Sequence, residues 1–361
     1  MKKKIHIIAG ARPNFMKIAP IIRELGTRKE SFEFQLIHTG QHYDHDMSDV
    51  FFEELAIPKP DFHLDIEGGS HSQQTASIMI KYEEILLANR PDIVLVVGDV
   101  NSTIATVLVA KKMGLLVAHV EAGLRSGDLT MPEEINRLAT DSISDLLFAT
   151  EPSAVENLNR EGKSAASIHF VGNVMVDNLL FQFERLKRSG FQSPHLRPVH
   201  GKFAVATLHR PANVDNLEKL TELLTSFNEI SAKYPIYFPV HPRTAQKINQ
   251  FSLQVSPNVF LLPPLGYMDF LSLWSQAEFV LTDSGGLQEE TTALGVECFT
   301  LRDNTERPIT ISEGTNTLLG TNGKAIVEYC LTQRQKKKPI SAPQFWDGRA
   351  AVRIVDVLES C

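Results

Sequence analysis

Short, continuously apolar runs alternate with amphipathic stretches along the first half of the chain. Each run is too apolar for a sheet that exposes one face to water, so the runs predict buried strands. The predicted strands are residues 4–9, 33–38, 93–97 and 115–120. Hydrophobic positions recur with helical spacing over residues 16–25, 73–89 and 103–113. This alternation predicts an α/β unit in which helices cover both faces of a parallel sheet.

The same alternation returns in the second half of the chain. Its predicted strands are residues 204–208, 236–240, 259–262, 279–282 and 297–301, and its predicted helices are residues 216–233, 267–276 and 287–294. A predicted helix over 174–187, then Ser189-Gly190 and a proline-bearing stretch, lies between the two halves. Glycine and proline punctuate structure, so we expect a domain boundary there. One expected domain comprises residues 1–171 together with residues 346–361, because a final helix over residues 348–358 would fold back onto the first half. The other expected domain comprises residues 172–345.

Composition agrees with two ordinary globular domains. The chain has 361 residues, and a typical domain has about 150. Hydrophobic residues make up 43% and charged residues 22%, which excludes a disordered tail, a collagen and a coiled-coil rod. The net charge of −7 argues against a nucleic acid partner. Three distant cysteines form no Cys-x-x-Cys pair, so we expect a reducing, cytoplasmic location and neither a disulfide framework nor a zinc ribbon.

The first residues imitate a secretory leader without completing one. Lysines at positions 2–4 precede an apolar stretch, but His6, Arg12, Pro13 and Lys17 interrupt it and no small-residue cleavage site ends it. No run approaches the roughly 20 apolar residues that span a bilayer. The sequence therefore predicts a protein with no membrane partner.

Open α/β domains bind ligands at the carboxyl ends of their strands. Arg12 and Lys17 flank the helix that follows the first predicted strand. The positive end of that helix with two cations would seat a diphosphate. The alternative is an ordinary strand-to-helix turn whose cations are solvated.

Three carboxylates stand near strand ends in the first half. Asp99 follows the strand at 93–97, and it would either act in chemistry or cap the next helix. Glu121 ends an apolar strand, where an ionised group is costly unless it is paired or functional. Glu133 lies three residues after Thr130, which has the form of a capping box. A role for Glu133 in chemistry competes with that structural role.

The second half offers complementary groups. His209 follows the strand at 204–208 and could bind phosphate or donate a proton. Ser284-Gly285-Gly286 opens a helix after the strand at 279–282, which would form an anion cradle of backbone N–H groups. Glu290, one turn further, could accept hydrogen bonds from a ribose diol. A loop histidine and a capped tight turn are the structural alternatives.

Some chemistries have no support in the sequence. The chain contains no Gly-x-Gly-x-x-Gly, which argues against a nicotinamide-binding domain, and no His-Glu-x-x-His. We therefore expect no metal and no cofactor.

Taken together, the strand ends resemble the non-hydrolysing UDP-N-acetylglucosamine 2-epimerase family. The matching segments keep the family's order over nearly the whole chain. They are Ala11-Arg12-Pro13 through Lys17, Gly98-Asp99, residues 119–128, Pro132-Glu133-Glu134 with Asn136-Arg137, Gly172-Asn173, His209-Arg210, residues 239–242, residues 282–286 with Gln288-Glu289-Glu290, and Arg302-Asp303 with residues 305–308. The resemblance implies the two-domain GT-B fold, with the active site in a cleft between two Rossmann-like domains.

The resemblance also implies roles for individual residues. The diphosphate would face Arg12, Lys17, His209, Ser284, Gly285, Gly286 and Arg307. Glu290 would hold the ribose, and His241 belongs to a matching segment and would bind substrate. Asp99, Glu121 and Glu133 match the acid–base carboxylates, and His209 joins them as a catalytic candidate. The family is usually homodimeric, and many members carry a regulatory UDP-sugar site, for which Gln41 and His42 are the candidates here.

The chain departs from the family pattern at Ala11, where threonine is usual, and in residues 68–71, which lack the usual arginine. Asn14 stands where the family usually has glutamate, and Tyr43 replaces an arginine of the regulatory segment. The expected reaction is interconversion of UDP-N-acetylglucosamine and UDP-N-acetylmannosamine through UDP and a 2-acetamidoglucal, in the synthesis of cell-surface polysaccharide precursors. The alternatives are a hydrolysing epimerase, a diacetamido-sugar epimerase, a GT-B glycosyltransferase and a non-catalytic UDP-sugar sensor.

Overall fold

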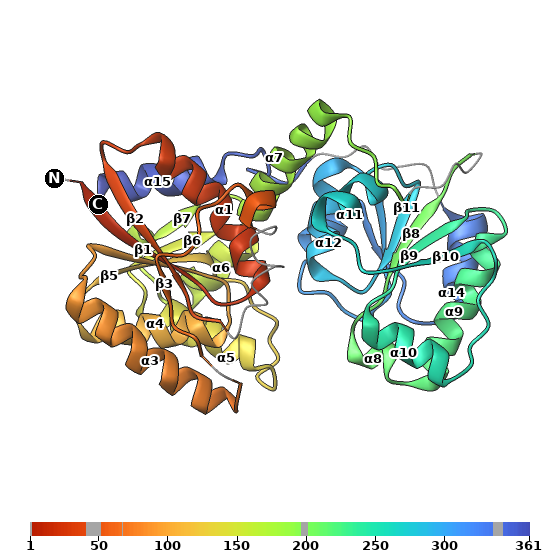
Figure 1. Cartoon of the computed structure of the whole chain (residues 1–361), viewed down its shortest axis with the longest axis horizontal. Coiled ribbons are helices and arrows are strands. Elements are labelled where there is room, and N and C mark those ends of the chain that lie inside the picture. Colours follow the sequence, from red (N-terminus) through yellow and green to blue (C-terminus); the bar gives the residue numbers. More distant parts are fainter. Residues whose placement is uncertain (1, 41–51, 67, 196–200, 335–341) are drawn as a thin grey trace. The chain divides into compact units, whose positions relative to one another are not determined.

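The chain forms two compact units in a computed structural model that describes residues 2–40, 52–66, 68–195, 201–334 and 342–361. The first unit comprises Met1–Phe181 with Gln344–Cys361, and the second comprises Gln182–Pro343. Each unit holds one parallel sheet with helices against it (Figure 1). The predicted α/β class with parallel sheets is confirmed. No helix in the described ranges is both long enough and apolar enough to cross a membrane.

The first sheet has the strand order β3-β2-β1-β4-β5-β6-β7. Its strands are β1 (Lys3–Ala9), β2 (Phe32–His38), β3 (Phe62–His63), β4 (Ile93–Val97), β5 (Leu116–Ala122), β6 (Leu146–Ala149) and β7 (Ile168–Phe170). The α-helices that begin in this unit are α1 (Arg12–Thr27), α3 (His71–Ala88), α4 (Asn101–Lys112), α5 (Pro132–Ile143), α6 (Pro152–Arg160), α7 (Val174–Ser189) and α15 (Ala350–Ser360). Helices α1 and α15 cover one face of the sheet, and α3, α4 and α5 cover the other (Figure 1).

The second sheet has the order β10-β9-β8-β11-β12-β13. Its strands are β8 (Ala204–Thr207), β9 (Ile236–Pro239), β10 (Val259–Leu262), β11 (Phe279–Thr282), β12 (Glu297–Thr300) and β13 (Asn316–Leu318). The helices are α8 (Pro211–Val214), α9 (Leu217–Ser231), α10 (Pro242–Gln250), α11 (Tyr267–Trp274), α12 (Gly285–Leu294), α13 (Ile309–Ser312) and α14 (Gly323–Glu328).

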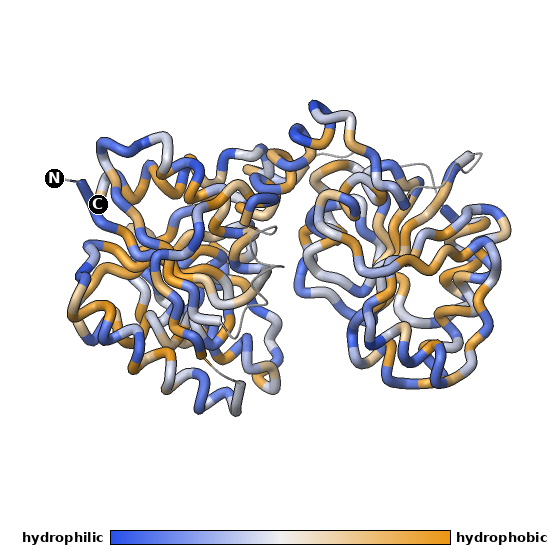
Figure 2. Tube along the Cα trace, viewed as in Figure 1, coloured by the Kyte–Doolittle hydropathy of each residue, from blue (hydrophilic) through white to orange (hydrophobic). Residues whose placement is uncertain are grey.

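The strands are hydrophobic along most of their length, and hydrophilic residues concentrate on the outer surfaces of the helices (Figure 2). The second sheet, for example, buries Phe238, Phe279 and Leu281 completely. Both predicted sets of strands, four in the first half and five in the second, are confirmed. The sequence analysis missed β3, β6, β7 and β13, which are only two to four residues long.

Each sheet reverses its direction of growth at one place. The chain leaves β1 towards β2 and leaves β4 towards β5, although β1 and β4 are neighbours. In the second sheet the same reversal lies between β8 and β11. Loops that diverge at such a switch point leave a crevice at the carboxyl ends of the strands, which is where open α/β sheets bind ligands. These two strand ends are therefore the places where a ligand site is expected.

Candidate active site

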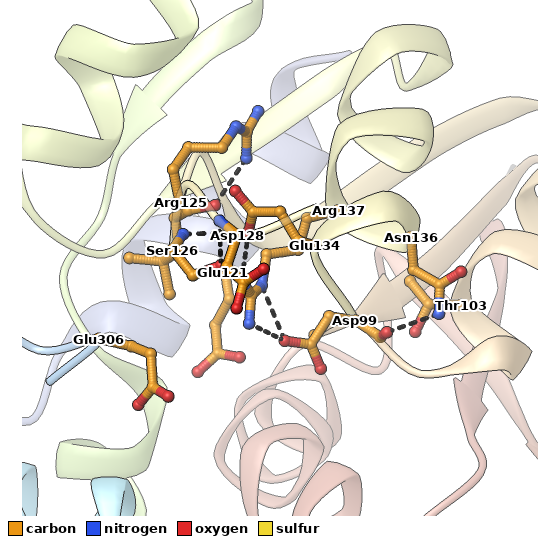
Figure 3. A network of polar contacts seen from close by, with 12 residues as sticks. Asp99, Thr103, Glu121, Arg125, Ser126, Asp128, Glu134, Asn136, Arg137 and Glu306 are labelled. Carbon is orange, nitrogen blue, oxygen red and sulfur yellow. Dashed lines mark hydrogen bonds and ion pairs between the residues drawn. The ribbon is translucent and has the colours of Figure 1, made fainter. Parts of the chain in front are cut away.

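The Asp99 carboxylate lies at the end of β4 and is held by an arginine. Arg137 of α5 places both its Nε and its Nη2 2.8 Å from the Asp99 Oδ2 atom (Figure 3). Asp99 does not cap α4, because the residue before that helix is Val100 and no side chain caps it. The capping alternative for Asp99 is therefore wrong, and the guanidinium favours the ionised carboxylate.

Glu134 is the second carboxylate that binds Arg137. It is 2% exposed, and its carboxylate accepts hydrogen bonds from the backbone N–H groups of Ser126 and Gly127, both at 3.0 Å. The Arg137 Nη1 atom lies 2.5 Å from Glu134 Oε2. Burial alone would raise the pKa of Glu134, but the backbone donors and the guanidinium outweigh it and lower that pKa. The charged pair thus ties the loop after β5 to Asp99.

Glu121 lies inside β5 rather than after it. A bulge between Val120 and Ala122 shifts the register with β6, and Glu121 itself has a φ of 70°. A positive φ is strained for a residue with a side chain. The bulge turns the buried Glu121 carboxylate onto the Lys17 ammonium of α1, with which it forms an ion pair. Figure 3 shows the Glu121 and Asp99 carboxylates extending to the same side of the network.

Lys17 and Glu121 both lie close to Gly98. Its φ is 68°, and a Cβ added there would lie 3.1 Å from Lys17 Nζ and 3.6 Å from Glu121 Oε2. Both the backbone conformation and the close approach favour glycine. The turn before Asp99 can therefore pass directly against the buried ion pair.

Glu133 is the second residue of α5 and lines a cavity of about 380 Å³ together with Asp99. The predicted capping box is wrong, because α5 is preceded by Met131 and the Thr130 hydroxyl donates to Asp128 instead. Among the residues that the structure describes, none forms an ion pair or hydrogen bond with the Glu133 carboxylate. Glu133 is therefore the carboxylate of the three that faces this cavity without a cation.

The loop after β1 is braced by Asn14. Its Oδ1 atom accepts hydrogen bonds from the backbone N–H groups of Gly10, at 3.2 Å, and Ala11, at 2.9 Å. The residue that departs from the family pattern thus shapes this loop. Arg12 begins α1, but its side chain lies outside the described part of the chain, as do the regulatory candidates Gln41 and His42.

In the second unit, Asp283 forms several hydrogen bonds at the other switch point, between β8 and β11. This completely buried carboxylate accepts hydrogen bonds from the backbone N–H groups of His209 and Arg210 and from the Asn213 side chain, at 3.0–3.1 Å. His209 Nδ1 lies 2.8 Å from Asp283 Oδ1. Burial would raise the pKa of Asp283, but His209 and the other donors lower it. Nδ1 therefore donates to Asp283, which leaves Nε2 of the half-exposed imidazole as the ring nitrogen that could contact a ligand.

The predicted anion cradle lies beside this histidine. Ser284 precedes α12 without capping it through its side chain. A Cβ added at Gly286 would meet no described atom within 4 Å, and one at Gly285 would meet only Glu306 Oε2 at 3.7 Å. The space in front of these glycines is therefore open, and a helix N-terminus with open space in front suits an anion.

Two acidic residues follow on α12. Glu290 is buried and accepts a hydrogen bond from the Tyr267 hydroxyl at 3.1 Å. Burial raises its pKa to about 7. Glu289 pairs with Arg307, whose Nε lies 2.9 Å from Glu289 Oε1. The predicted phosphate ligand Arg307 thus contacts Glu289, the residue that precedes the predicted ribose ligand Glu290.

His241 follows β9, the strand beside β8, and precedes α10. Its Nδ1 atom accepts a hydrogen bond from the Arg243 backbone N–H at 3.2 Å. That arrangement gives the imidazole a structural role as a helix cap.

The structure thus brings the predicted residues together in two groups. Lys17, Asp99, Glu121 and Glu133 gather in the first unit, and His209, the glycines of α12 and Glu290 gather in the second. The sequence analysis assigned no role to Arg137, Glu134 or Asp283. A glutamate and an arginine three residues apart on one helix face, and an aspartate ending the strand beside His209, were the available signals.

Comparison with known proteins decides the family. The sequence model described as "UDP-N-acetylglucosamine 2-epimerase" matches residues 24–359. The chain belongs to the UDP-N-acetylglucosamine 2-epimerase family. The enzyme of that name from Methanococcus maripaludis is 45% identical over 98% of both chains. A UDP-2,3-diacetamido-2,3-dideoxy-D-glucuronate 2-epimerase from Pseudomonas aeruginosa is 40% identical over 98% of this chain and 99% of the relative.

Solved structures of the 2-epimerase family share the fold. The Methanocaldococcus jannaschii UDP-GlcNAc 2-epimerase, in complex with UDP-GlcNAc and UDP, superposes with a TM-score of 0.85 at 42% identity, covering 99% of this chain and all of that one. The Neisseria meningitidis enzyme bound to UDP-GlcNAc gives 0.87 at 30% identity, with 99% and 100% covered. These relatives bind UDP-sugars, and they share the two-sheet architecture that carries the carboxylates and the α12 glycines here.

Proposed function

We propose that this protein is a non-hydrolysing UDP-N-acetylglucosamine 2-epimerase, which interconverts UDP-N-acetylglucosamine and UDP-N-acetylmannosamine. The observation that carries the proposal is the group of three carboxylates, Asp99, Glu121 and Glu133, at one switch point of a family member. Proton removal and return at one carbon need carboxyl groups of this kind. The names of the relatives that are more than 40% identical support the substrate.

The nucleotide is bound by the second unit in this proposal. The diphosphate lies at the α12 N-terminus, with His209 Nε2 and Arg307 as further donors, and Glu290 accepts from the ribose hydroxyls. Lys17 and Arg12 of α1 add positive charge. Fixed donors and cations stabilise the charge that develops as UDP leaves.

The chemistry proceeds by elimination. A carboxylate removes the C2 proton, the C2–H electron pair forms a C1–C2 double bond, and the C1–O bond breaks with its electron pair leaving on UDP. The products are 2-acetamidoglucal and UDP, held together. A second carboxyl group then protonates C2 from the opposite face while a UDP oxygen bonds to C1. Atoms and charge balance without water, which distinguishes this route from hydrolysis.

The contacts divide the roles between the carboxylates. Arg137 favours the ionised form of Asp99, so Asp99 starts as the base. Glu133 lines the same cavity and has no cation among the described residues, and we assign it the role of the acid. Glu121 is paired with Lys17, and a bound diphosphate would compete for that ammonium. Binding of the leaving group would then weaken the ion pair between Glu121 and Lys17.

One alternative substrate has a specific observation in its favour, namely the 40% identical epimerase of a diacetamido glucuronate. A uronic acid brings a second carboxylate. The cavity that Asp99 and Glu133 line contains no lysine or arginine among its described lining residues. An additional carboxylate would be repelled there, so the neutral acetamido sugar is the better fit.

Product analysis tests the proposal. Purified protein is incubated with UDP-N-acetylglucosamine, and the products are identified by proton NMR. We expect UDP-N-acetylmannosamine to accumulate to an equilibrium that is also reached from the other epimer, with no free sugar. Free N-acetylmannosamine with UDP would establish a hydrolysing enzyme, and turnover of only the diacetamido uronic acid nucleotide would establish the alternative substrate.

A further inference from the structure

A buried histidine contacts the backbone next to Asp99. His119 is in the middle of β5 and is completely inaccessible to solvent. Its Nδ1 atom lies 2.7 Å from Asp141 Oδ1, and its Nε2 atom lies 2.8 Å from the Gly98 carbonyl oxygen. A carbonyl oxygen only accepts, and an ionised carboxylate only accepts. Nε2 therefore donates to the Gly98 carbonyl, and Nδ1 faces the Asp141 carboxylate, so the ring connects the two groups.

The network continues from the ring through Asp141. Asp141 of α5 is also completely buried, and its Oδ2 atom lies 2.7 Å from the Arg125 guanidinium. Burial would raise the pKa of Asp141, but His119 and Arg125 lower it. Arg125 in turn holds Glu161 through two contacts of 2.7–2.8 Å. Arg125 thus pairs with both carboxylates, an arrangement that makes the buried charge of Asp141 tolerable.

The network contacts the backbone beside two of the proposed catalytic carboxylates, at the turn before Asp99 and at the turn after Glu121. His119 donates to the carbonyl of Gly98, the residue before Asp99. Asp141 accepts the backbone N–H of Gly123, two residues after Glu121, at 2.9 Å. Gly123 has a φ of 84°, and a Cβ there would collide with the Ala154 carbonyl oxygen. The strained Glu121 backbone is thus followed by a turn that Asp141 holds in place.

We propose that the His119–Asp141 pair is a positioning device that fixes the Asp99 and Glu121 turns relative to each other. The inference rests on the proposed function, because it assumes that these carboxylates do the chemistry. Neither His119 nor Asp141 reaches the substrate in this account. They act by holding the backbone at Gly98 and the backbone at Gly123 in fixed positions, from β5 and α5.

Two substitutions separate the two halves of the device. Glutamine at position 119 places an amide N–H near the former Nε2 and keeps the donor to Gly98, whereas asparagine keeps the donor to Asp141. We expect His119→Gln and His119→Asn each to lower kcat by about 10- to 100-fold, since a misplacement of about 1 Å costs that much. The Kd for UDP alone should change less than kcat, because the proposed nucleotide contacts other than Lys17 and Arg12 belong to the second unit.

A matched control distinguishes positioning from general destabilisation. His6 of β1 is a second completely buried histidine in the same sheet, with its ring nitrogens 3.3 Å from the Tyr82 hydroxyl and 3.2 Å from Gln35 Oε1. His6→Gln should lower thermal stability without lowering kcat comparably. Hydrogen exchange adds a readout independent of turnover: the Gly98 and Gly123 amides should lose protection in the His119 variants and keep it in His6→Gln.

The outcomes are separable. Turnover of both His119 variants within twofold of wild type, or an equal kcat loss in His6→Gln at equal stability, would overturn the positioning role. Wild-type protein that fails to convert any UDP-sugar would instead refute the proposed function, and the amide exchange would still report whether the pair holds the two turns.

Discussion

Replacement of Glu290 by glutamine should stabilise the second unit at alkaline pH. Glu290 is buried, and its pKa is raised from 4.5 to about 7. A carboxyl group with a raised pKa binds more protons in the folded than in the unfolded chain, so its ionisation destabilises the fold as pH rises from about 4.5 to about 7. Each pKa unit corresponds to about 1.4 kcal/mol. Wild type should therefore lose about 3 kcal/mol above pH 7 relative to a neutral isostere.

The assay follows the second unit alone. The chain has two tryptophans, of which Trp274 lies buried in α11, so a Trp346→Phe background leaves one reporter. Urea unfolding at pH 5.5 and 8.5 gives the free energy of unfolding. From linkage, we expect Glu290→Gln to exceed wild type by about 1 kcal/mol at pH 5.5 and about 3 kcal/mol at pH 8.5.

A control of opposite sign exists in the same unit. Glu278 pairs with Lys202 and Arg334, and although burial opposes them, these partners lower its pKa. Glu278→Gln should destabilise at pH 8.5, with the loss fading as pH falls. If Glu290→Gln were no more stable than wild type at pH 8.5, or if its advantage did not grow with pH, the burial argument would be refuted.

The same variant should raise the Kd for UDP about tenfold, since it loses a charged acceptor.

Three further changes test other contacts. Asp99→Asn should slow epimerisation by at least about 10²-fold, and near-normal turnover would remove Asp99 from the mechanism. Lys17→Met should weaken UDP binding about tenfold in a calorimetric titration, and unchanged affinity would exclude a diphosphate contact. Asp177 accepts the Ala350 and Ala351 backbone N–H groups at the start of α15, so Asp177→Ala should destabilise the first unit by about 1–2 kcal/mol; unaltered unfolding would show that the cap contributes nothing.

The sequence predicted the long strands because each is a continuous apolar run, and it predicted Asp99 and His209 because each follows such a run directly. Glu121 shows the limit of this reasoning. Its position was predicted, but the bulge that turns its side chain onto Lys17 depends on pairing with β6, a short strand that the hydrophobic pattern did not reveal.

Contacts between side chains that are distant in sequence could not be predicted either. Arg137 is 38 residues from Asp99, and Asp283 is 74 from His209. Which side chains meet depends on strand order, and periodicity does not specify strand order. The capping box at Thr130 failed for a local reason: the loop folded the hydroxyl onto Asp128, and α5 began later.

The central claim is that carboxyl groups exchange the C2 proton while UDP is detached from the sugar. Epimerisation of UDP-N-acetylglucosamine in heavy water, followed by proton NMR at early times, tests it most directly. We expect one deuterium at C2 of the UDP-N-acetylmannosamine formed. Product that retains its original hydrogen at C2 would contradict it.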